Sequence, residues 1–93
     1  MEIRYSIELD STVIQQDLPR LDASWRTIIR DTVREKLTTR PELYGRPLRQ
    51  ELKGCWKLRV GDYRVVFQIH ARTVRIIAII HRSSNYKGVQ KRI

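Results

Sequence analysis

The sequence predicts an α+β fold, in which an N-terminal strand and a helical hairpin pack on a curled, mainly antiparallel sheet of about four strands. Residues 3–9 alternate apolar and polar side chains, as a half-buried strand does. Residues 10–37 carry apolar side chains at helical spacings, and residues 56–81 return to the two-residue period. A chain of 93 residues supports one hydrophobic core, so residues 1–93 are expected to form a single domain.

The composition restricts the location and the partners of the chain. No apolar run is long enough to cross a bilayer, and the charged N-terminus differs from a signal peptide. Cys55 is the only cysteine, which excludes an internal disulfide and suits a reducing cytoplasm. The net charge is +9, and residues 41–93 hold twelve Lys or Arg against three acidic residues. This surplus favours a polyanionic partner, either nucleic acid or an acidic protein.

The first strand should bury its alternate apolar residues: Ile3, Tyr5, Ile7 and Leu9. A short helix then begins at Asp10 or Ser11 and is interrupted by Pro19. Its packed face carries apolar residues at helical spacing: Ile14, Leu18 and Leu21.

A longer helix is predicted over residues 23–37, with Asp22 or Ser24 as its cap. Its apolar stripe consists of residues three or four apart: Trp25, Ile28, Ile29, Val33 and Leu37. Arginines and acidic residues alternate on the other side, as is typical of a solvated face. The two helices would form an antiparallel hairpin, followed by a loop over residues 40–47.

The hairpin of residues 56–70 yields the most specific prediction. If Gly61 and Asp62 form a two-residue turn, Arg59 faces Arg64 across the strands. One face of the hairpin is then apolar: Trp56, Leu58, Val60, Tyr63, Val65 and Phe67. The other face carries Lys57, Arg59 and Arg64, with no carboxylate between them.

The last strand is expected over residues 73–81, after a short turn at Ala71 and Arg72. It would add four residues to the core face: Val74, Ile76, Ala78 and Ile80. His81 would then join the cations near Asp62 and Arg64.

The three cations suggest a binding site for an anion. Like charges directly opposite each other destabilise a sheet by a few tenths to about 1 kcal/mol, so a bound phosphodiester would explain Arg59 and Arg64. Tyr86 adds a ring that can stack on a base, which favours single-stranded RNA. In the alternative interpretation the cations only protect the sheet from aggregation, and Tyr86 packs against the core.

Two segments carry a family resemblance: PLRQELKGCWKLRVGDYRVVFQI and HRSSNYK. With them the chain resembles the RelE/ParE superfamily of bacterial toxins, and more narrowly the RelE-type messenger-RNA endonucleases (mRNA interferases). The resemblance implies the element order βααβββ and a toxin of a type II toxin–antitoxin system. It also implies cleavage in the ribosomal A site by the 2′-hydroxyl of the substrate, which leaves a 2′,3′-cyclic phosphate and uses no metal or other cofactor. No cluster of carboxylates or histidines in the sequence suggests a metal site.

The resemblance also assigns roles to four candidate catalytic residues. Lys57 matches a lysine that helps to activate the 2′-hydroxyl, and Arg64 an arginine that stabilises the charged phosphate. Arg82 matches an arginine that stabilises the transition state or protonates the leaving group. Tyr86 matches a tyrosine that stacks on the nucleotide. Further basic residues are expected to bind RNA: Lys53, Arg59, His81 and Lys87.

The chain departs from the family pattern at two positions. Asn85 stands where many members have valine, and Arg46 where some relatives have a glutamate base. The tail after Tyr86 is expected to be a final strand or a disordered arm.

The expected partners are messenger RNA, the ribosome and a cognate antitoxin. An acidic antitoxin segment that folds on binding would cover the cations or the helical grooves. Three alternatives remain: a ParE-type inhibitor of DNA gyrase, a non-catalytic module that binds RNA or the ribosome, and a degenerate toxin. The residues matched to RNA cleavage argue against the ParE type.

Overall fold

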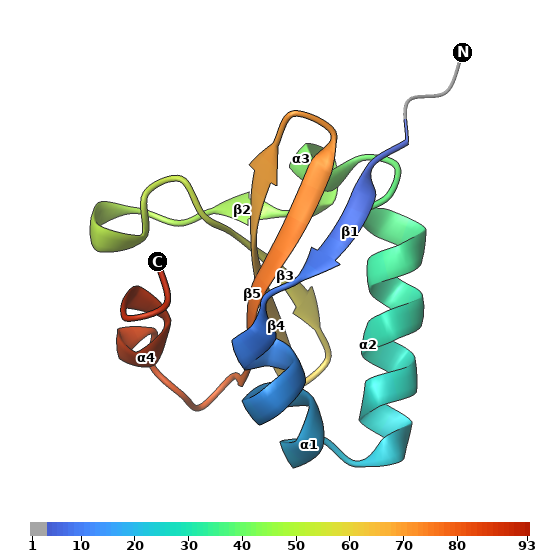
Figure 1. Ribbon diagram of the computed structural model, residues 1–93, viewed down its shortest axis with the longest axis vertical. Helices are drawn as coiled ribbons and strands as arrows, with labels where there is room; N and C mark the ends of the chain where they lie inside the picture. The colour runs from blue at the N-terminus through green and yellow to red at the C-terminus, as the bar shows by residue number, and fades with distance from the viewer. Residues whose placement is uncertain (1–3) are drawn as a thin grey trace.

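The computed structural model describes residues 4–93 and confirms the α+β class. Its five-stranded sheet has the order β1-β5-β4-β3-β2. Helix α2 (Ala23–Lys36) covers one face of the sheet, and the C-terminal helix α4 (Lys87–Gln90) lies on the other side (Figure 1). Ile3, an expected member of the first strand, lies outside the described residues.

The central hairpin has the predicted register. In β3 (Trp56–Val60) and β4 (Tyr63–His70), Arg59 pairs with Arg64. The turn requires Gly61, because its φ is 58° and a Cβ there would lie 2.5 Å from the Trp25 ring. Strand β1 (Ser6–Leu9) pairs in parallel with β5 (Thr73–His81), whereas the other strand pairs are antiparallel. The sheet is therefore mainly antiparallel, as predicted.

The predicted side-chain directions are wrong for the second half of β5, where the register is shifted by one residue. A β-bulge interrupts its ladder with β4: Phe67 pairs with Ile76, but Val66 pairs with Ala78. The extra residue, Ile77, moves every later side chain of β5 to the opposite face. Ile79 therefore joins the main core, while Ala78 and Ile80 belong to a second apolar cluster.

The first helix starts with α-helical Ser11 and Thr12 and widens into a π-helical turn, η1 (Val13–Asp17), which α1 (Leu18–Arg20) continues. This wider turn changes which residues face the core. The buried positions are four apart: Val13, Asp17 and Leu21. Ile14, predicted to pack inward, is 53% exposed, and the carboxylate of Asp17 is buried instead.

Helix α2 starts at one of its two predicted caps, since the Asp22 carboxylate accepts a hydrogen bond from the Trp25 N–H at 3.0 Å. Ile29 and Val33 are buried against the sheet. Ile28 was placed on the same stripe, but it is 47% exposed. Only one side of the helix faces the sheet, and this side contains Ile29 but not Ile28.

Residues 40–47 are not only a loop. They contain the short helix α3 (Pro41–Tyr44) and the fifth strand, β2 (Arg46–Pro47), which pairs with the start of β3. Gly45 joins them at a close approach to Phe67, since a Cβ at Gly45 would lie 2.5 Å from the Phe67 ring.

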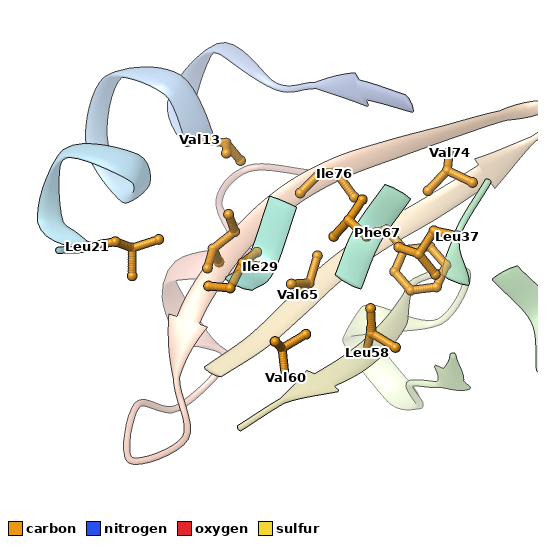
Figure 2. Packing of buried hydrophobic residues seen from close by; sticks show 12 residues of the cluster. Val13, Leu21, Ile29, Leu37, Leu58, Val60, Val65, Phe67, Val74 and Ile76 are labelled. Atoms are coloured by element: carbon orange, nitrogen blue, oxygen red, sulfur yellow. The ribbon is translucent and has the colours of Figure 1, made fainter. Parts of the chain in front are cut away.

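Two apolar clusters lie on opposite faces of the sheet. Figure 2 shows the main core, where Val13 and Leu21 meet Ile29 of α2 and Val65 of the sheet. The second cluster is smaller: Leu52, Cys55, Val66, Ile77, Ala78 and Val89. Its outer side comes from residues 48–55, which include the helical turn η2 (Gln50–Leu52), and from α4. The tail is thus a docked helix, neither a strand nor a disordered arm.

Candidate nucleic-acid interface

Four basic side chains share one face of the sheet. Residues directly opposite each other in an antiparallel sheet point to the same side. Arg46 of β2 pairs with Lys57 of β3, and Arg59 of β3 pairs with Arg64 of β4. Lys57 and Arg59 are two residues apart, so all four belong together, and we call them the cationic face. From the sequence, Arg46 stood out only as a departure from the glutamate base of some relatives, because a two-residue strand carries too little pattern to be recognised as part of the sheet.

The cationic face is not neutralised from within. The ion pairs found in residues 4–93 involve none of its four members. The Arg64 guanidinium instead folds back on the turn, where its Nη1 donates to the carbonyl oxygens of Gly61 at 3.0 Å and Tyr63 at 2.9 Å. These bonds fix the direction of Arg64 and leave Nε and Nη2 for an anion.

Arg82 approaches the same turn from the end of β5. Its N–H donates to the Asp62 carbonyl oxygen at 2.7 Å, and its Nε lies 3.6 Å from the Asp62 carboxylate. The two side chains are 62% and 52% exposed, so water weakens this ion pair and another anion can compete for Arg82. Arg59, Arg64 and Arg82 therefore all lie around the Gly61–Asp62 turn.

His81 does not join the cationic face, contrary to the prediction. It pairs with Tyr63, and the two rings meet edge to face with centroids 5.4 Å apart. Because of the bulge at Ile77, His81 points to the side of the main core. Its Nδ1 lies 2.7 Å from the hydroxyl oxygen of Ser83, which follows the end of β5. His81 is therefore at the margin of the sheet.

Tyr86 is half-buried against the second cluster and directly precedes α4. Packing of Tyr86 against an apolar cluster is thus confirmed, while stacking of its ring on a base stays a prediction. Lys87 is exposed at the start of α4, where its N–H donates to the Asn85 side-chain oxygen at 3.0 Å. Lys53 is exposed on the segment that borders the other side of the cluster. The second cluster is therefore covered, and Tyr86, Lys53 and Lys87 lie around its margin.

The described residues, 4–93, contain neither a candidate metal site nor a candidate membrane-spanning helix. Within residues 4–93, no three His, Cys, Asp or Glu side chains come together as a group that could hold a metal ion. No helix in this part of the chain has the length and apolar character needed to span a membrane.

A second candidate surface lies on the other side of the sheet. A groove of about 760 Å³ runs between α2 and the β1 edge, and we call it the α2 groove. Its floor is apolar: Ile7, Leu9, Leu18, Ile29, Val33 and Ile76. Arg26, Arg30 and Arg34 follow one another at four-residue intervals along its helical wall. This groove is separate from the cationic face.

Comparison with known proteins agrees with this architecture. Residues 7–86 match the family described as "ParE toxin of type II toxin-antitoxin system, parDE". The chain belongs to this family. The toxin is 37% identical over 86 residues to "Toxin RelE" of Mycobacterium tuberculosis, covering 89% of this chain and 87% of the relative. It is 30% identical to "Toxin RelG" of the same organism, over 83% of this chain and 91% of the relative.

Solved structures show the same fold. A chain of the toxin–antitoxin complex RelBE2 from Mycobacterium tuberculosis superposes with a TM-score of 0.80 and 28% identity, over 88% of this toxin and 95% of that chain. A mutant of E. coli toxin RelE in the free state has a TM-score of 0.66 at 22% identity, over 96% and 93% of the two chains. The protein is thus a type II toxin with a RelE-like fold.

Proposed function

We propose that this toxin cuts messenger RNA in the ribosomal A site, with the cationic face and Arg82 as its active site. The observation that carries the proposal is that Arg59, Arg64 and Arg82 lie around the Gly61–Asp62 turn, where Arg59 and Arg64 are directly opposite each other. Like charges directly opposite each other destabilise a sheet, and an anion bound between them would offset that cost. One of the named relatives is "Toxin RelE", and the RelE type is the one whose resemblance implies RNA cleavage.

The chemistry requires one bond to form and one to break. The 2′-oxygen of the substrate bonds to phosphorus, and the bond from phosphorus to the 5′-oxygen breaks, which leaves a cyclic phosphate. Lys57, as the neutral amine, accepts the 2′-hydroxyl proton. Arg59 and Arg64 bind the phosphate oxygens, on which negative charge builds up in the transition state.

Arg82 stabilises the departing 5′-oxygen by its positive charge. Of the two roles that the resemblance allows, protonation is the weaker, because a guanidinium does not release its proton near neutral pH. Water then supplies the proton to the 5′-oxygen. Asp62 holds Arg82 over the turn until RNA binds.

The remaining predicted residues would bind RNA around this centre. Tyr86 would present the accessible part of its side chain to a nucleotide that lies at the margin of the second cluster. Lys53 and Lys87 border the same cluster and would contact the RNA backbone. Arg46 extends the cationic face along β3. His81 would reach RNA only at the margin of the sheet.

The proposed protein partner is a cognate antitoxin that docks in the α2 groove. The most similar of the solved chains named above comes from a toxin–antitoxin complex. An apolar floor with three arginines along its wall fits an amphipathic segment that has apolar residues on one side and acidic residues on the other. Binding there would leave the cationic face to a second part of the antitoxin.

The test compares growth arrest with antitoxin binding. Each variant is expressed from a tightly controlled promoter, and its complex with the antitoxin is isolated in parallel. Arg64→Ala combined with Arg82→Ala should abolish growth arrest and still bind the antitoxin through the α2 groove. Arg72→Ala, an exposed arginine in the turn between β4 and β5, should retain growth arrest. Toxicity of the double variant would refute the proposed site.

One observation favours a second candidate. The matching family is described by the ParE name, and a ParE-type gyrase inhibitor is the alternative within this superfamily. Gyrase inhibition would stop DNA supercoiling without any cut in messenger RNA. A supercoiling assay with purified gyrase separates the two candidates.

A further inference from the structure

A buried ion pair fastens the C-terminal tail to the rest of the toxin. Among residues 4–93, Asp17 is the one buried charged residue, and its side chain is 4% exposed. Arg92 reaches it from beyond α4 and makes two parallel hydrogen bonds, of 2.6 Å to Oδ2 and 2.9 Å to Oδ1. This is the bidentate geometry in which guanidinium and carboxylate bind most strongly.

The pair also satisfies main-chain groups next to the bulge. Asp17 Oδ2 accepts the Ile79 N–H at 2.9 Å, and Arg92 Nη1 donates to the Ile77 carbonyl oxygen at 3.0 Å. Strand β1 ends at Leu9, opposite Ile76, and does not cover this part of β5. The π-helical turn places Asp17 beside this part of β5. Here the main-chain groups of β5 form hydrogen bonds with side chains, because no neighbouring strand reaches them. The hydrogen bonds that Arg92 donates to the Asp17 carboxylate raise the pKa of Arg92 above its ordinary value.

Helix α4 depends on this pair for its position. It is a single turn of four residues, too short to be stable alone. Val89 anchors its inner side in the second cluster. On its other side Gly88 borders a cavity of about 350 Å³ that extends toward α1 and the end of β5, so packing alone does not fix the helix. Arg92 supplies the second anchor.

Tyr86 is coupled directly to the same turn. Its carbonyl oxygen accepts hydrogen bonds from the N–H groups of Val89 at 3.1 Å and Gln90 at 3.2 Å. The Arg92 N–H in turn donates to the Val89 carbonyl oxygen at 2.9 Å. A continuous set of main-chain bonds therefore links Arg92 to Tyr86.

We propose that Asp17 and Arg92 are positioning residues, which hold Tyr86 at the margin of the second cluster in the orientation that RNA cleavage requires. Neither residue touches RNA, because Asp17 is buried and the Arg92 guanidinium is occupied by Asp17 and Ile77. The inference rests on the proposed ribonuclease function. It adds that activity depends on an ion pair on the opposite side of α4 from the chemistry.

The test measures cleavage kinetics and local order in the same variants. Arg92→Ala should lower kcat on programmed ribosomes by about tenfold to a hundredfold, the scale of a misplaced catalytic group. KM should change by less than about threefold, since the RNA-binding cations stay in place. Amide hydrogen exchange should rise in residues 86–92 and remain unchanged in β3 and β4.

Two further variants define the cause. Lys91→Ala removes an adjacent exposed charge from the same tail and should behave like the intact toxin. Arg92→Lys keeps the charge but not the planar fork, and should recover part of the lost kcat. This variant also keeps the test valid if Arg92→Ala does not fold.

The outcomes are distinct. If Arg92→Ala shows faster exchange in residues 86–92 but full kcat, the pair is only structural and the inference is overturned. An equal loss of kcat in Lys91→Ala would also overturn it, because loss of tail charge would then explain the effect. If the intact toxin cuts no messenger RNA, the proposed function falls and the inference falls with it.

Discussion

Arg59 and Arg64 lie directly opposite each other across the central hairpin, with no carboxylate in ion-pair contact with either residue in the described part of the chain. Arg46 pairs with Lys57 in the same way one step further along the sheet. Two consecutive pairs of like charge are an energetic cost that the folded toxin carries when no ligand is bound. A phosphate bound between the guanidinium groups, as the proposed function requires, would remove this cost.

Arg59→Thr should therefore make the free toxin more stable. Removing one charge of the pair relieves a repulsion of a few tenths to about 1 kcal/mol, and threonine suits a strand. The free energy of unfolding from urea titration should rise by this amount, while binding to single-stranded RNA weakens. Arg72→Thr lies in a turn without an opposing cation and serves as the control. A less stable Arg59→Thr toxin would contradict the repulsion.

Tyr86 should respond differently to loss of its hydroxyl and loss of its ring. Tyr86→Phe keeps the packing on the second cluster, so the free energy of unfolding should change by less than about 0.5 kcal/mol. Tyr86→Ala should cost about 1–2 kcal/mol of stability and at least about tenfold in cleavage rate, through lost burial and lost stacking. Equal cleavage by Tyr86→Ala and the intact toxin would exclude a role in holding the nucleotide.

Gly45→Ala tests the junction that brings β2 to the cationic face. The new Cβ would lie 2.5 Å from the Phe67 ring and 2.9 Å from the Pro41 carbonyl oxygen, and the backbone has to move. Overpacking of this kind typically costs about 1–3 kcal/mol, which a urea titration measures. Gly88→Ala is the matched control, since its Cβ would meet no atom within 4 Å. A similar loss in both variants would show that the close approach to Phe67 is not the cause.

Arg34→Glu should separate antitoxin binding from toxicity. The residue lies on the wall of the α2 groove, and an acidic segment docked there would meet a repulsive charge. The Kd for the cognate antitoxin, measured by calorimetry, should rise by at least about tenfold, with RNA cleavage unchanged. Arg72→Glu reverses a charge outside the groove and should leave the Kd unaltered. An unchanged Kd for Arg34→Glu would place the antitoxin elsewhere.

The sequence was sufficient for the hairpin because its signals agree. Alternation is strict from Trp56 to Val60, and Gly61 with Asp62 fixes the turn, so only one register buries the apolar residues. In β5 both faces are apolar from Ile76 to Ile80, and alternation does not reveal an inserted residue there. The bulge, and with it the placement of His81, was invisible for this reason.

Two further features depended on tertiary contacts. Asp17 occupies a buried position four residues after Val13 and four before Leu21. Because Asp17 is charged, the sequence did not indicate that this position is buried. Only the distant Arg92 explains its burial. The same holds for the tail, whose four helical residues are stabilised by the second cluster and not by their own sequence. Local patterns do not encode partners that lie 75 residues apart.

The most direct test of the central claim is cleavage of messenger RNA on programmed ribosomes, with the 3′ ends of the products mapped and their chemistry determined. The intact toxin should cut within the A-site codon and leave a 2′,3′-cyclic phosphate. Arg64→Ala should slow this reaction by about 10²–10³-fold, the usual effect of removing one stabilising donor. Growth arrest by the intact toxin without such cuts, or cuts that Arg64→Ala makes equally fast, would contradict an active site on the cationic face.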